Sequence, residues 1–159
     1  MSELLTERGY EEPCVRQISL FLQNRVGELG SVLRHLDKNG ISLHAISVDD
    51  SVDHAVMRIV VDDFENARQM LRDINVPSSV SEVLAVELGE EDHVLLDLCR
   101  TLIRAEINIH YAYSMLTRPR DRAVALIHVD DNGTAVELLR QAGFHLFYDR
   151  DLAGPSLSP

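Results

Sequence analysis

An internal repeat limits what this chain of 159 residues can fold into more than any other feature of the sequence. Moving the sequence by 66 positions aligns apolar residues with apolar residues. In the first aligned stretch, Ile18, Leu20 and Leu22 fall on Leu84, Val86 and Leu88. In the second, Leu29, Val32, Leu33 and Leu36 fall on Leu95, Leu98, Cys99 and Leu102. After an insertion near Pro119 the shift becomes 68, which places Ala67 and Leu71 on Ala135 and Leu139. One structural unit therefore occurs twice.

Each repeat has the same order of predicted elements. Alternating apolar residues predict a strand over residues 15–22, and apolar spacing of i, i+3, i+4 and i+7 predicts a helix over 27–38. Further strands are expected over 41–48 and 55–61, followed by a helix capped by Asp62 or Asp63 and a strand from about residue 80. A change of apolar phase between Ala45 and Ile46 indicates a β-bulge.

This βαββαβ order predicts an α+β fold of two ferredoxin-like units. Each helix has one apolar stripe, so both helices of a unit should cover one face of an antiparallel sheet with strand order 4-1-3-2. We expect a lead-in over 1–14, units over 15–81 and 82–150, and a flexible tail over 151–159. No Pro- or Gly-rich linker separates the units, which predicts one rigid body.

The composition disfavours several classes of partner. The net charge is -11 and the pI about 4.9, whereas nucleic acids and anionic membranes attract basic proteins. No apolar run approaches the ~18 residues that a membrane span needs, and the N-terminus lacks a signal-peptide pattern. We therefore expect a cytoplasmic protein that binds neither nucleic acid nor membrane.

The segment between the first strand and the first helix is the clearest candidate binding site. Asn24 offers a side-chain acceptor, and Gly27 permits close approach of the backbone. Peptide N–H groups at the start of a helix favour a carboxylate or a phosphate. The alternative is that Asn24 only caps the helix and Gly27 only permits the turn.

No pattern for catalysis, metal binding or cofactor binding stands out. The seven histidines are scattered and show neither H-x-x-x-H nor H-E-x-x-H spacing. No Walker A loop, G-x-S-x-G elbow or Cys–His pairing of known spacing occurs. The sequence therefore predicts no enzyme, no metal site and no cofactor.

The N-R-x-G-x-L-G turn, the N-G-I-S-L stretch that starts at Asn39 and the element order together resemble the ACT domain. A tandem pair over about 15–150 is similar to small stand-alone two-ACT proteins that lack a catalytic domain. The resemblance implies a sensing or regulatory protein that binds a free amino acid at an interface between modules. Carried over, the contact residues are Asn24, Arg25, Val26, Gly27, Glu28 and Leu29. Many relatives have Pro at the position of Val26.

The second repeat departs from this pattern. Its turn reads Glu90-Glu91-Asp92-His93, so the glycine is lost and acids replace it. A carboxylate would be repelled there, and a cationic group would be preferred. Tyr111 and Tyr113, on the second strand of this repeat, are candidates to line a site against the first repeat. The alternative is that both rings only pack on the sheet.

We expect a homodimer, because the strand over 41–48 would lie at the edge of a sheet and offer it for pairing. Two other functions stay open: an assembly module without a ligand, and a small enzyme that uses an acid–histidine pair on the same fold. The sequence names neither the amino acid nor a regulated enzyme or transcription factor.

Overall fold

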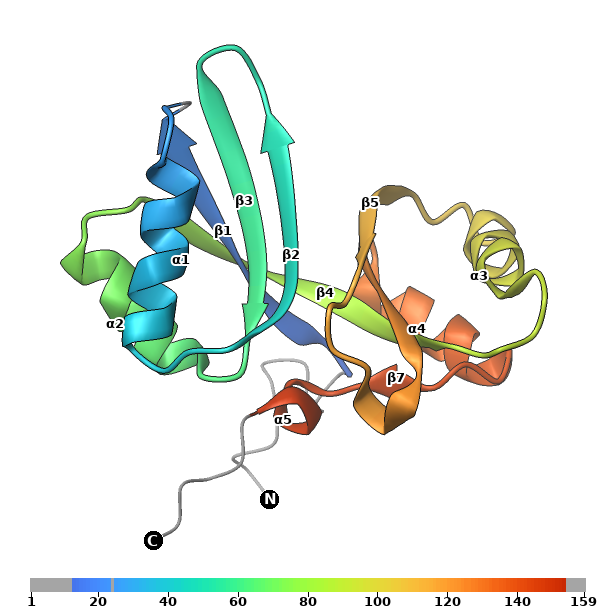
Figure 1. Ribbon diagram of the computed structural model, residues 1–159. Helices are drawn as coiled ribbons and strands as arrows, with labels where there is room; N and C mark the ends of the chain where they lie inside the picture. Colours follow the sequence, from blue (N-terminus) through green and yellow to red (C-terminus); the bar gives the residue numbers. More distant parts are fainter. Residues whose placement is uncertain (1–12, 24, 154–159) are drawn as a thin grey trace, which may run out of the picture.

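The computed structural model describes residues 13–23 and 25–153. Its elements are, in order, β1 (Val15–Gln23), α1 (Glu28–Lys38), β2 (Leu43–Asp50), β3 (His54–Val61), α2 (Phe64–Asp73), β4 (Ser78–Leu88), α3 (Val94–Ile103), β5 (Ile109–Ser114), η2 (Pro119–Asp121), β6 (Ala123–Val129), α4 (Asn132–Gln141), β7 (Leu146–Phe147) and α5 (Asp149–Leu152). Figure 1 shows α1 and α2 on one side of the strands and α3 and α4 on the other.

The ends of the helices follow the repeated sequence. Asp63 caps α2 by accepting a hydrogen bond from the N–H of Asn66 at 3.1 Å. Asp131 caps α4 in the same way, through the N–H of Thr134 at 3.1 Å. Gly40 follows α1 with a φ of +68°, the left-handed conformation expected just after a helix. The predicted β-bulge in β2 is confirmed by a register shift between Leu43 and Ala45.

The strands form one sheet, whereas we expected two units, each with its own sheet. Within this sheet, β4-β1-β3-β2 and β7-β4-β6-β5 are neighbours in the order 4-1-3-2 that we expected for each unit. Seven strands join in the order β2-β3-β1-β4-β6-β5, and β7 pairs with β4 beside this path. The reason is that β4 is continuous: residues 78–83 pair with β1, and residues 84–88 pair with β6. The expected boundary between residues 81 and 82 thus lies inside a strand. Below, the "first half" is the part of the chain before residue 84, and the "second half" is the rest.

Three clusters of buried side chains fill the molecule. One lies under α1 and α2 and includes Ile18 and Leu36, and its counterpart under α3 and α4 includes Leu84 and Leu102. The third cluster, which we call the junction core, draws on both halves. Its buried members are Val15, Ala45, Val60, Val83, Ala85, Met115, Val124, Leu126, Phe147 and Leu152. The two halves therefore pack through the sheet faces that carry no helices.

The two ends of the sheet path meet at this junction. Ala45 of β2 forms an isolated antiparallel bridge with Met115, and the N–H of Leu116 donates to the carbonyl of His44 at 2.7 Å. The ring of His44 lies 2.9 Å from the hydroxyl of Thr117 and 2.5 Å from the carbonyl oxygen of Leu152. The edge of β2 that we expected to pair with a second copy is thus partly covered within the chain.

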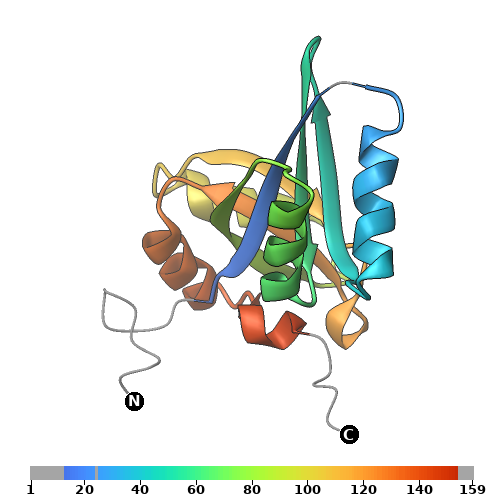
Figure 2. The same ribbon diagram turned by 90° about the vertical axis from the view of Figure 1, so that its left-hand side faces the viewer.

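The two ends of the described chain are more ordered than expected. We expected a flexible tail from residue 151, but residues 149–152 form α5, which lies below the strands in Figure 2. The side chain of Leu152 is buried in the junction core. Asp149 of α5 accepts hydrogen bonds from the backbone N–H and the guanidinium of Arg16 at 3.0 and 2.8 Å. Cys14, in the expected lead-in, is buried in the core under α3 and α4. These contacts fasten α5 and the start of β1 to each other.

Candidate functional site

The predicted turn leads directly into α1. Gly27 occupies the N-cap position with a φ of +85°, a conformation that glycine adopts without strain. A Cβ atom added there would meet no atom within 4 Å, so the space beside Gly27 is open. Gly27 has no side chain with which to cap α1, which leaves the first N–H groups of the helix without that acceptor. The geometry fits an approaching anionic group.

The other residues of the turn surround this opening. Arg25, Val26 and Leu29 are exposed, and Glu28 is half-buried. One carboxylate oxygen of Glu28 is buried without a hydrogen-bond partner among the described residues. Residues 25–29 follow one another along the chain, and most of them face the solvent. Asn24, also predicted as a contact, lies outside the described residues.

The equivalent turn of the second half keeps the backbone conformation and loses the glycine. His93 is the N-cap residue of α3 with a φ of +73°, so a side chain occupies the left-handed position. Glu90, Glu91 and Asp92 before it are all exposed. A histidine therefore tolerates the conformation that Gly27 adopts, at some cost in backbone strain.

Tyr111 and Tyr113 point toward the first half and share one partner. Gln17 of β1 is completely buried; its amide nitrogen donates to the hydroxyl of Tyr111 at 2.7 Å, and its carbonyl oxygen accepts from the hydroxyl of Tyr113 at 2.7 Å. Burial, together with Tyr111, raises the pKa of Tyr113 well above its usual value, while Arg58 opposes that shift. This hydrogen-bonded cluster joins the halves.

A stack of side chains continues from this cluster. The guanidinium of Arg58 lies 4.0 Å from the centre of the Tyr111 ring and forms an ion pair with Asp49. The ring of His128 stacks on Tyr111, with ring centres 4.9 Å apart. Sequence reasoning missed Gln17, Arg58 and His128, because a polar residue that alternates with apolar ones in a strand normally indicates the solvent face.

The two predicted sets of site residues are far apart in one chain. Gln17, which holds the tyrosines, and Gln23, which precedes the turn, are six positions apart on β1. At about 3.3 Å per residue, this separates them by roughly 20 Å. A site that used both sets would need two copies of the chain.

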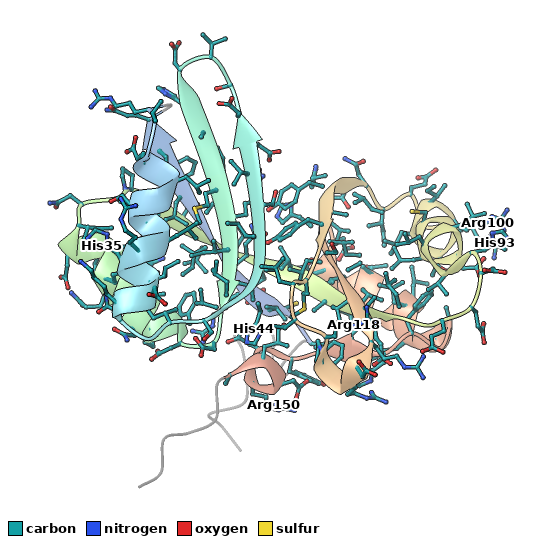
Figure 3. The ribbon with its side chains drawn as sticks, in the orientation of Figure 1. His35, His44, His93, Arg100, Arg118 and Arg150 are labelled. Atoms are coloured by element: carbon teal, nitrogen blue, oxygen red, sulfur yellow. The ribbon has the colours of Figure 1, made fainter. Side chains whose placement is uncertain are left out.

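A large cavity lies beside the second turn, away from both sets. Its volume is about 540 Å³, and it opens between α3 and the segment that leads from α4 into β7. A second cavity of about 390 Å³ lies at the junction and is lined by His44, Thr117 and Leu152, among others. In Figure 3, His44 and Arg118 lie near the middle of the molecule, and His93 and Arg100 lie at the outer end of the second half.

Comparison with known families decides the identity of this fold. The model of the ACT domain pair matches residues 13–154, nearly the whole chain. The chain belongs to the ACT domain pair family. The expected resemblance is thereby confirmed, although the boundary between the two ACT repeats falls within a shared strand.

Solved structures agree with this assignment at the level of the fold. Protein BT0572 from Bacteroides thetaiotaomicron has a TM-score of 0.82 at 24% identity, over 91% of this chain and 99% of that one. The regulatory subunits of aspartate kinase from Thermus thermophilus and Thermus flavus have TM-scores of 0.57 and 0.54 at 17% and 16% identity. Each of these alignments covers 80% of this chain, and 91% and 92% of the respective subunits. No curated protein matches the chain at a significant level.

The described part of this ACT pair contains no helix that is long and apolar enough to cross a membrane. Among the described residues, no group of three or more His, Cys, Asp or Glu side chains is arranged to hold a metal ion.

The position of His128 predicts that the stability of the ACT pair depends on pH. Burial, followed by the charges of His110 and Arg58, lowers the pKa of His128, and its buried Nδ1 has no partner among the described residues. On acidification, the His128 imidazole of the unfolded protein takes up a proton near its ordinary pKa of about 6.5. In the folded protein it takes up the proton only at lower pH. Stability should therefore fall as the pH drops below about 6.5.

Urea unfolding at neutral and mildly acidic pH should show a smaller loss of unfolding free energy on acidification for His128→Gln than for wild type. The exposed His54→Gln should behave like wild type, and an equal loss in all three proteins would contradict the assignment.

Proposed function

We propose that this ACT pair is a non-catalytic regulatory protein that binds a free amino acid at the turn over residues 25–29. The open backbone beside Gly27, at the uncapped start of α1, is the observation that carries the proposal. The N–H groups of Val26 and Gly27 and the dipole of α1 are suited to an α-carboxylate. The named function of the two Thermus proteins, regulatory subunits of aspartate kinase, supports a regulatory role.

The ammonium group of the ligand needs an acid near the turn. Glu28 fits this role, because one of its oxygens is buried without a hydrogen bond among the described residues. Asp49 of β2 is a less suitable partner for the ammonium group, because it already pairs with Arg58. The side chain of Asn24 stays a predicted contact to the ligand.

The second wall of the site comes from another copy of the chain in this proposal. The turn lies roughly 20 Å from Tyr111 and Tyr113 of the same chain, and Val26 is fully exposed. An amino acid bound at the turn of one protomer would be covered by a strand of its partner, which makes the protein a homodimer. The partner's strand would shield the charged hydrogen bonds, each worth roughly 1.5–3 kcal/mol. Two or three of them suffice for micromolar affinity.

Gly27→His should weaken binding of the amino acid at least about tenfold, because the new side chain fills the space that the ligand approaches. Histidine is the best-matched replacement, since His93 adopts the same conformation at the equivalent position. Isothermal titration of wild type against the proteinogenic amino acids identifies the ligand, and the variant is then titrated with it.

His93→Gly is the matched control and should bind like wild type. Circular dichroism establishes that both variants are folded. Unchanged affinity in a folded Gly27→His would place the site elsewhere. If no amino acid binds wild type, the ligand class is wrong, and the assembly module becomes the better interpretation.

A further inference from the structure

The 540 Å³ cavity of the second half has a lining of mixed charge. Its volume is in the range of small-molecule sites, about 300–1,000 Å³. The acids Glu87, Glu91 and Asp97 contribute to the wall, as do the bases Arg100 and Arg104. Apolar atoms of Val94 and Phe144 complete it. Because both signs are present, the cavity suits neither a simple anion nor a simple cation.

Most of these charges are already balanced within the protein. Asp97 lies 3.8 Å from Arg100, one turn apart on α3. The carboxylate of Glu87, whose side chain is only 14% exposed, lies 3.2 Å from Arg120 and 4.0 Å from Arg122. These two acids and one base of the wall therefore have ion-pair partners before any ligand arrives, although one buried oxygen of Glu87 has no hydrogen bond among the described residues.

Two charges of opposite sign remain. Among the residues that the structure describes, neither Glu91 nor Arg104 has an ion-pair partner, and both are exposed. Glu91 precedes α3 and Arg104 follows it, and ten helical residues span about 15 Å. Arg104, with Thr101 and Ala142, also lines an adjoining cavity of about 340 Å³ that runs toward α4. The unpaired carboxylate and guanidinium thus lie at opposite ends of a long hollow.

The first half does not repeat this arrangement. At the shift of 66 positions, Glu91 corresponds to Arg25 and Arg104 to Lys38, so both equivalent charges are positive. The pairing of an acid with a distant base is therefore a property of the second half alone.

We propose that this cavity is a second ligand site, which binds an extended zwitterion whose amino group and carboxylate are several bonds apart. The ammonium group pairs with Glu91, the carboxylate with Arg104, and the connecting chain lies against Val94 and Phe144. An α-amino acid without a second charged group has its two charges too close together to reach both ends. The site is separate from the turn at Gly27, and it stands or falls independently of the function proposed above.

The test uses 6-aminohexanoate, a zwitterion that lacks the α-ammonium carboxylate group of an amino acid. Titration into the full chain, followed by ¹H–¹⁵N NMR, should shift the amides of Thr101 and Gly143 in a saturable way and leave that of Gly27 in place. Hexanoate and hexylamine should bind at least about tenfold more weakly, because each forms only one of the two ion pairs. Arg104→Gln should weaken binding of 6-aminohexanoate about tenfold, and the matched variant Lys38→Gln should not change it.

Each of these titrations can overturn the proposal. The proposal fails if 6-aminohexanoate gives no saturable shift up to about 50 mM, a concentration at which even weak sites fill. It also fails if hexylamine binds equally well, or if Arg104→Gln and wild type bind alike. A saturable shift at Gly27 in place of Gly143 would show that 6-aminohexanoate binds at the first turn and not in this cavity. None of these results alters the titration of α-amino acids at the first turn.

Discussion

Gln17→Leu should lower the free energy of unfolding by about 2–4 kcal/mol, although leucine nearly preserves the volume of glutamine. Gln17 is completely buried and is the hydrogen-bond partner of both tyrosine hydroxyls at the junction. Removing it leaves two hydroxyl groups unpaired in a half-buried place, at about 1–3 kcal/mol each. Urea unfolding measures the loss. Gln69→Leu, at an exposed position of α2, is the control and should change stability little.

A multiple mutant separates lost hydrogen bonds from lost packing. If unpaired tyrosine hydroxyls cause the damage, adding Tyr111→Phe and Tyr113→Phe to Gln17→Leu should restore part of the stability, because both of those hydroxyls are then absent. The hydroxyl of Ser19, which accepts from Gln17 at 3.4 Å, still loses this contact. A triple variant less stable than the single one would show instead that the tyrosines contribute through contacts other than Gln17.

Leu126→Ala should cost about 2–5 kcal/mol and should destabilise both halves in one transition. Leu126 is completely buried in the junction core, where side chains of both halves meet. Its loss leaves a cavity between the two packed sheet faces, which the continuous strand β4 prevents from separating freely. Three of the four tyrosines, Tyr111, Tyr113 and Tyr148, belong to the second half, so the tyrosine signal reports mainly that half. Far-ultraviolet circular dichroism reports the helices of both halves. The two unfolding curves should coincide.

Leu116→Ala is the control, because the side chain of Leu116 is 63% exposed. Two separate transitions in Leu126→Ala would refute the shared core.

Local structure was predictable wherever one segment of the sequence determines it. The tight turn at Gly27, the aspartate cap of α2 and the bulge in β2 each follow from a few neighbouring residues, and the structure contains all three. The family assignment rests on the same short patterns joined to the repeat.

The arrangement of the halves was not predictable by the same means. A period of two assigns residues to the faces of a strand, but does not state what covers each face. The alternation therefore placed the side chain of Gln17 on the face expected to contact solvent, although the second half of the chain covers it. Likewise, Leu152 lay in the expected flexible tail, yet the junction core buries it, and Arg16 binds Asp149 just before it. Contacts between residues more than a hundred positions apart leave no local signal.

The continuous strand β4 makes the two repeats inseparable, even though their sequences are alike. Residues 78–83 pair only with β1 and residues 84–88 pair with strands of the second half. If the gene is cut before β4, the first fragment lacks the residues that pair with β1. If it is cut after β4, the second fragment lacks the residues that pair with β6. Either fragment would also present to water the apolar face that the other now covers. The unit that can fold by itself is therefore the pair, and a single repeat is only part of it.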